Sequence, residues 1–219
     1  MTDQQQAFRD IIDVFNKEGV LPYVMLIGSW AEYIYQSCLI PGFRANLRTS
    51  DVDFLYTNLK KPQNRKLSII EGLKEKGFLY VESRGSAVGK FVKEDLLELE
   101  FLTRALGEGR QVNCIPSLNI NAVGLRELNM LGNYPLVLDY QGFKVTVPEP
   151  EAYVLHKLLI NQKRKSGKKE KDIESVEGLM SYIDLERAIM ILASLPKKNQ
   201  RAIDATMALH HIRFKKKTT

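Results

Sequence analysis

The chain has few cysteines and no long apolar segment. It contains only Cys38 and Cys114, so it offers neither a disulfide framework nor the ligand spacing of a structural zinc site, and we expect both thiols to be buried. No apolar run approaches the roughly 18 residues of a membrane-spanning helix, so no membrane partner is expected. The first ten residues lack the basic and apolar regions of a secretory signal, which predicts a cytoplasmic location.

Histidine, glycine and proline are also sparse. The three histidines are His156, His210 and His211, which make no His-rich ligand set, and His156 is predicted to be a core or interface residue. With 14 Gly and 8 Pro the chain is not collagen-like or of low complexity. Instead, 44% hydrophobic and 26% charged residues predict a globular protein with one sizeable core or two modest ones.

The charge balance favours an anionic partner. Lys and Arg number 32 against 26 Asp and Glu, a net charge of +6 that suits nucleoside triphosphates or RNA. Much of the excess lies in residues 163–171, which we expect to form a basic loop, and in the tail at 213–217. Because basic runs are usually solvated surface, charge alone does not identify the partner.

Hydrophobic periodicity predicts an α/β (α+β) fold. We expect a mixed, twisted sheet flanked by helices in residues 1–147, followed by a helical domain in residues 148–219, with the boundary at the prolines 148 and 150. The expected strands are residues 23–27, 51–56, 78–82, 96–103, 136–138 and 143–147. The expected helices are residues 6–17, the segment after Gly28, and residues 67–77, 151–163, 172–182, 185–195 and 199–214.

A Gly-Ser pair follows the first buried strand. Gly28 and Ser29 stand where that strand gives way to a helix. A helix N-terminus presents unpaired N–H groups and a partial positive charge, and glycine lets an anion approach the backbone closely. The pair therefore predicts a phosphate-binding turn, to which Ser29 can add its hydroxyl.

Acidic residues occupy one face of two further strands. Asp51 and Asp53 are two residues apart, so both point to the same side of their strand and can bind a hard divalent cation through oxygen. On the strand of residues 96–103, Glu100 or, as the weaker choice, Glu98 supplies a third acid. Asp51, Asp53 and Glu100 thus form a candidate catalytic and metal-binding triad for Mg²⁺ or Mn²⁺.

At these residues the sequence resembles the DNA polymerase β-like nucleotidyltransferase superfamily. The pattern of that superfamily is Gly-Ser or Gly-Gly at a helix start followed by Asp-x-Asp, matched here by Gly28-Ser29 and Asp51-Val52-Asp53. The stretch between the two motifs, residues 36–48, is longer than in the minimal members. The resemblance implies transfer of a nucleoside monophosphate from an NTP.

The second half of the chain looks like the AbiEii-type branch, the type IV abortive-infection toxin-like nucleotidyltransferases. The similarity spans residues 22–176 and rests on Pro150-Glu151-Ala152, His156-Lys157-Leu158-Leu159, Arg164 and Lys171-Asp172-Ile173. It implies that Lys157 contacts nucleotide phosphate, that Asp172 is catalytic, and that an antitoxin-like partner is a candidate. Independently, a helix would place Lys157 and Arg164 on one stripe, where both can grip a triphosphate.

Three functional hypotheses fit this sequence. The leading hypothesis is a Mg²⁺-dependent nucleotidyltransferase that moves NMP to a hydroxyl of RNA, protein or a small molecule and releases pyrophosphate. The alternative is a catalytically silent nucleotide- or RNA-binding module of the same fold. A metal nuclease fits less well, because hydrolysis needs no triphosphate-binding turn. Both residues also have a purely structural interpretation, in which Lys157 extends its amine from the core to water and Asp172 caps a helix.

Overall fold

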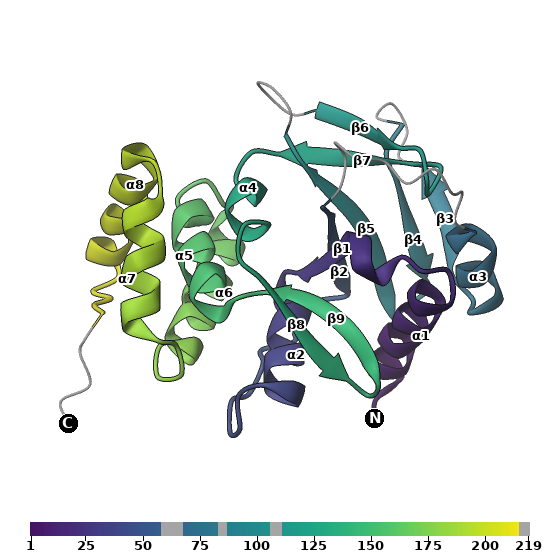
Figure 1. Ribbon diagram of the computed structural model, residues 1–219, viewed down its shortest axis with the longest axis horizontal. Helices are drawn as coiled ribbons and strands as arrows, with labels where there is room; N and C mark the ends of the chain where they lie inside the picture. The colour runs from purple at the N-terminus through teal and green to yellow at the C-terminus, as the bar shows by residue number, and fades with distance from the viewer. Residues whose placement is uncertain (58–67, 83–86, 106–110, 215–219) are drawn as a thin grey trace.

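The computed structural model describes residues 1–57, 68–82, 87–105 and 111–214 (Figure 1). The tail lysines 215–217 lie outside the described residues. Within that part of the chain a mixed sheet runs β1 (Val24–Ile27), β2 (Asp51–Tyr56), β5 (Leu97–Arg104), β4 (Gly89–Lys93) and β3 (Leu79–Glu82). β7 (Ile120–Leu125) pairs with β5 beyond the end of β4, and β6 (Gln111–Ile115) pairs with β7. The expectation of a mixed α/β fold is confirmed.

Three helices alternate with the first strands along the chain: α1 (Asp3–Lys17), α2 (Ser29–Cys38) and α3 (Ile69–Glu75). α1 begins at a capping box between Thr2 and Gln5, and its apolar stripe is fully buried. Phe15 from α1 packs against Phe54 of β2 and Phe101 of β5. The core side of the sheet is therefore the side of Phe54 and Phe101, and alternate residues of the same strands face away from it.

The second half is a hairpin followed by helices. β8 (Pro135–Tyr140) pairs with β9 (Phe143–Pro148), and α5 (Pro150–Asn161), α6 (Ser166–Leu179), α7 (Leu185–Ser194) and α8 (Lys197–Leu209) follow. Figure 1 shows these helices together on one flank of the sheet. The predicted domain boundary falls between β9 and α5. One hydrophobic cluster contains residues from both sides of this boundary, so the core does not separate two domains, and the division stays a prediction.

Two buried hydrogen bonds join α2 to α5 and to the end of β9. The Tyr153 hydroxyl donates to Oε1 of Glu32 at 2.6 Å, and the Tyr35 hydroxyl donates to the Pro148 carbonyl at 2.7 Å. Glu32 is 1% exposed, so its carboxylate depends on such a donor. These bonds hold the start of α5 and the strand before it against the helix that starts at Ser29.

Several expectations need correction. The pattern did not predict β4, β6, β7, the 3₁₀ turn η1 (Leu21–Tyr23) or the short helix α4 (Leu128–Leu131). Residues 166–171, expected as a basic loop, form the first turns of α6, because Lys and Glu are strong helix formers. Asp172 therefore lies inside a helix and caps none. Cys38 is half-buried and Cys114 is exposed on β6, so neither thiol is a core residue.

None of the described helices is long and apolar enough to cross a membrane.

Candidate active site

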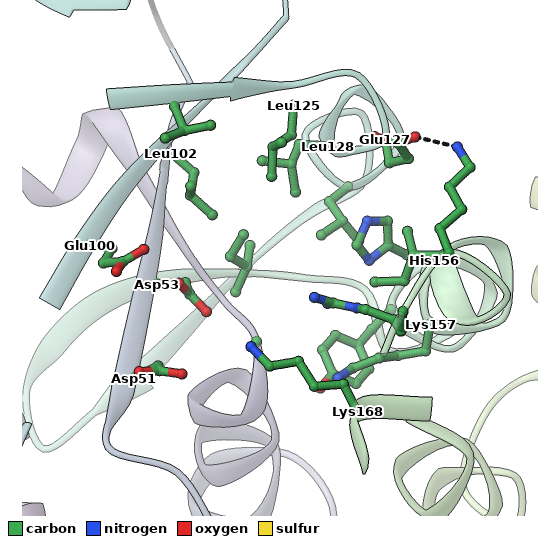
Figure 2. Close-up of a pocket in the computed structure, with 18 residues that line it drawn as sticks. Asp51, Asp53, Glu100, Leu102, Leu125, Glu127, Leu128, His156, Lys157 and Lys168 are labelled. Atoms are coloured by element: carbon green, nitrogen blue, oxygen red, sulfur yellow. Dashed lines mark hydrogen bonds and ion pairs between the residues drawn. The ribbon is translucent and has the colours of Figure 1, made fainter. Parts of the chain in front are cut away.

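Two parallel neighbouring strands bring the predicted acids to one face. In the register of β2 and β5, Asp51 lies opposite Glu98 and Asp53 opposite Glu100. Their chain neighbours Val52 and Leu99 are completely buried on the other face. Asp51, Asp53 and Glu100 all line one cavity of about 540 Å³, to which α5 and α6 also contribute (Figure 2).

Glu98 is engaged elsewhere. Its carboxylate forms an ion pair with Lys90 of β4, and this hydrogen bond raises the pKa of Lys90. Lys90 also lies opposite Glu100 in the β4–β5 register, but its side chain donates its hydrogen bond to Glu98. Of the two glutamates that the sequence leaves open, Glu100 is the one that faces the cavity with Asp53.

The surroundings of Asp53 disfavour its ionised form. Burial raises the pKa of Asp53 to about 6, and the charges of Glu100 and Asp51 act in the same direction. Lys168 and Arg164 lower it again, although by less. A carboxyl in such surroundings gains from a bound cation, because opposite charge favours its ionised form.

The donor chemistry suits a hard divalent cation, since oxygen ligands from two aspartates and one glutamate are what Mg²⁺ and Mn²⁺ prefer. In the described part of the chain, however, no three acidic, histidine or cysteine side chains lie close enough to form a finished ligand set. The three acids share a face, and the charges of Asp51 and Glu100 act on Asp53. Mg²⁺ stays a prediction.

Gly28 forms the edge of the site next to Asp53. Its φ is +69°, a conformation that favours glycine, and a Cβ atom there would lie 2.8 Å from Oδ2 of Asp53. α2 starts at Ser29 without a side-chain cap, so its first N–H groups are available to an anion. Gly28 itself lines the cavity, whereas Ser29 stands beside it and is not among the lining residues.

The opposite wall carries the two predicted phosphate ligands. Lys157 from α5 and Arg164, which follows the end of α5, both line the cavity. Both also contact Asp172 of α6: Lys157 Nζ donates to Oδ1 at 2.7 Å, and Arg164 Nε is 3.4 Å from Oδ2. Asp172 is 3% exposed and is not among the lining residues. It lies behind the two cations and fixes their position.

Lys168 is a cavity residue that sequence reasoning missed. It comes from the first turns of α6, and Figure 2 shows its side chain reaching towards Asp51 and Asp53. The signal that could have found it is its spacing from Asp172: residues four apart share one helix face. Because residues 163–171 were expected to form a loop, this relationship was not visible.

The remainder of the cavity is apolar. Figure 2 shows Leu102, Leu125 and Leu128 on the side away from Asp51. The aliphatic residues that line the cavity are Ile27, Leu102, Val123, Leu125, Leu128, Leu131 and Ile160. At its edge, Lys163 Nζ lies 2.5 Å from Oε1 of Glu127, an ion pair between α5's C-terminal end and the residue before α4.

His156 lies in this apolar part. The ring is 7% exposed, and burial together with Lys157 and Arg164 lowers its pKa to about 3, so the imidazole is neutral. Its Nε2 is buried and has no hydrogen-bond partner within the part of the chain that the structure describes. The expectation of a buried histidine is met, but the ring lines the cavity.

Comparisons with known proteins identify the family and the fold. A family model described as nucleotidyltransferase matches residues 6–194. No curated protein matches the chain significantly. Among solved structures, ANT(2")-Ia in complex with adenylyl-2"-tobramycin is 12% identical with a TM-score of 0.51, and the match covers 95% of this chain and 99% of that one. That similarity shows the fold.

Two further solved structures resemble the chain less closely. An antigenic nucleotidyltransferase-like protein from Paracoccidioides brasiliensis is 19% identical with a TM-score of 0.49 over 94% of this chain and 97% of that one. Lincomycin-bound lincosamide antibiotic adenylyltransferase LnuA is 16% identical with a TM-score of 0.44 over 81% and 97%. Because the family model matches most of this chain, the chain belongs to the nucleotidyltransferase family.

Proposed function

We propose that this nucleotidyltransferase transfers a nucleoside monophosphate from an NTP to an acceptor hydroxyl in a metal-dependent reaction and releases pyrophosphate. The observation that carries the proposal is the placement of Asp51, Asp53 and Glu100 in one cavity beside the Gly28 turn. Carboxylates beside an anion-binding helix start are the parts that phosphoryl chemistry needs.

The residues divide into two groups. The N–H groups at the start of α2, together with Lys168, Lys157 and Arg164, bind the triphosphate oxygens. Asp51, Asp53 and Glu100 would hold Mg²⁺ or Mn²⁺, which when bound supplies Lewis-acid stabilisation of the attacking and leaving oxygens. The acceptor oxygen forms a bond to the α-phosphorus, the bond from that phosphorus to the bridging oxygen breaks, and the hydroxyl proton passes to a carboxylate oxygen.

For Asp172 we propose a positioning role in place of a catalytic one. Its two oxygens face Lys157 Nζ and Arg164 Nε, and it reaches the cavity only through them. An ion pair this deeply buried restricts the lysine to one geometry. Asp172 therefore holds the two cations where phosphates can meet them.

The test is transfer of label from each α-labelled NTP, with Mg²⁺ or Mn²⁺, into the small-molecule, RNA and protein fractions of a cell extract. We expect wild type to label one fraction and the Asp51→Asn/Asp53→Asn variant to lose at least 100-fold in rate. The matched control is Asp139→Asn, an exposed aspartate of the β8–β9 hairpin, which should keep wild-type activity. Equal transfer by wild type and the double variant would exclude the two aspartates from the mechanism.

The second candidate, a silent NTP- or RNA-binding module, is favoured by one observation: the described acids do not form a finished metal-ligand set. Calorimetry separates the two. NTP binding that is independent of Mg²⁺, with no transfer in any fraction, would support the silent module. The AbiEii-type branch and an antitoxin-like partner also remain proposals, which co-purification with a neutralising protein would support.

A further inference from the structure

One half of the cavity contains none of the residues that the proposed function assigns to the triphosphate or the metal ion. Its walls are the leucines, valine and isoleucine of β5, β7, α4 and α5, and Figure 2 shows Leu102, Leu125 and Leu128 on the side away from Asp51. Leu102 and Leu125 line the cavity and are only half-buried, so part of their apolar surface is accessible to a ligand. A concave apolar wall with a few polar groups is the usual form of a small-molecule site.

This half carries almost no uncompensated charge. Glu127 is paired with Lys163 at its edge. The other cations that line the cavity near the acids, Lys157, Arg164 and Lys168, are those that the proposed function assigns to the triphosphate. An RNA backbone would need free cations here and a polycation would need free acids, so neither matches this wall.

The sheet order determines which substrate this half faces. Gly28 follows β1, on one side of β2, while Leu102 and Leu125 lie on β5 and β7, on the other side. In phosphoryl transfer the attacking and leaving oxygens stand roughly in line on opposite sides of the phosphorus. If pyrophosphate leaves towards the Gly28 turn, the acceptor approaches from the side of β5 and β7.

His156 supplies the polar group of this half. Its Nε2 is buried and, among the described residues, has no partner, which costs free energy unless a ligand completes the hydrogen bond. Figure 2 shows the ring between Leu128 and Lys157, within the group of side chains that line the cavity. A ligand here would thus meet apolar side chains on several sides and one neutral imidazole.

We infer that the acceptor is an uncharged small molecule with a hydroxyl group on a mostly apolar body, bound between Leu102, Leu125 and Leu128 with a polar group on His156. The inference rests on the proposed function and identifies its acceptor class. The acceptor oxygen bonds to the α-phosphorus, its proton goes to a carboxylate oxygen, and pyrophosphate leaves with the electron pair of the broken bond.

The test uses two probes and the full chain. The uncharged alcohol 2-phenylethanol is titrated by ligand-observed NMR, and an α,β-methylene NTP analogue with Mg²⁺ is titrated by calorimetry. We expect both to bind at once, neither weakening the other more than about threefold. Leu125→Asn should weaken 2-phenylethanol about tenfold, because it removes apolar contact area, and leave the analogue within about twofold. The exposed Val137→Asn on β8 is the matched control and should change neither affinity.

A second variant tests the imidazole. His156→Leu should weaken 2-phenylethanol relative to ethylbenzene, which lacks the hydroxyl, whereas wild type should prefer the alcohol. Equal preference in both proteins would remove His156 from the acceptor site.

Three results would overturn the inference. Competition between 2-phenylethanol and the analogue would mean that the nucleobase occupies the apolar half. Tighter binding of a polycationic aminoglycoside or an oligoribonucleotide than of the alcohol, or no saturable binding of the alcohol while the analogue binds, would exclude an apolar acceptor. Absence of Mg²⁺-dependent analogue binding would instead overturn the proposed function, and the acceptor role with it, even where the alcohol still bound.

Discussion

Gly28 and Asp53 are in direct apposition: a Cβ atom on Gly28 would lie 2.8 Å from Oδ2 of Asp53. The contact joins the turn that we propose to bind phosphate to the acidic group, so a methyl group at this position must displace the carboxylate. Gly28 also has φ +69°, where an L-residue is strained.

Gly28→Ala should therefore lose at least 100-fold in transfer rate, since small misplacements at a reacting centre have effects of that size. Gly19→Ala is the matched control, because Gly19 has φ +71° and open space around it. Both variants should lose roughly 1–2 kcal/mol in urea unfolding. Full activity in Gly28→Ala would contradict the importance of the contact.

Asp53→Asn should stabilise the metal-free protein at pH 7.5. The pKa of Asp53 is raised from 3.8 to about 6, so the folded chain binds its proton more tightly than the unfolded chain does. The ionised carboxylate thus destabilises the fold above pH 6, by about 3 kcal/mol, and this penalty disappears as the pH falls through 6 towards 3.8. Urea unfolding in EDTA should show a variant that is more stable than wild type at pH 7.5 and level with it near pH 4.

Asp139→Asn provides the contrast for that experiment. The hydrogen bond from Lys144 lowers the pKa of Asp139, the opposite direction. Its substitution should give no stabilisation at pH 7.5. A pH-independent gain in Asp53→Asn would show that charge repulsion is not the cause.

Replacing both members of the buried Lys157–Asp172 pair should abolish activity and cost little stability. Removing one partner leaves an uncompensated buried charge, so Lys157→Met or Asp172→Leu alone should lose about 3–5 kcal/mol in chemical denaturation. The double variant Lys157→Met/Asp172→Leu should recover most of that stability and still fail to transfer nucleotide. Recovered activity in the double variant would show that Lys157 does not bind phosphate.

Lys168 is exposed, so it can be changed without disturbing the core. Lys168→Gln should raise the KM for NTP about tenfold, the equivalent of one charge-assisted contact, with an unchanged unfolding midpoint. Lys165→Gln, an exposed lysine just before α6, is the matched control and should leave KM unaltered. Equal KM values in the two variants would place Lys168 outside the triphosphate site.

The helical half shows why part of the site could not be read from the sequence. Lys168 and Asp172 share a helix face only because α6 begins at Ser166, and a run of lysines is equally typical of a solvated loop. The apolar half of the cavity depends on β7 and α4, two short elements without a clear period. Neither strand order nor the partner of a buried charge is encoded in local spacing.

The sequence by itself determined the parts that depend on near neighbours in the chain. These are the buried strand, the Gly28 turn and helix start, and the common direction of Asp51 and Asp53, because strand and helix periods fix the direction of each side chain. Tertiary structure decided the rest. β4 brings Lys90 to Glu98 and leaves Glu100 with the aspartates, and α6 places Asp172 behind Lys157. These are contacts between separate elements, and only packing of the whole core sets which elements become neighbours.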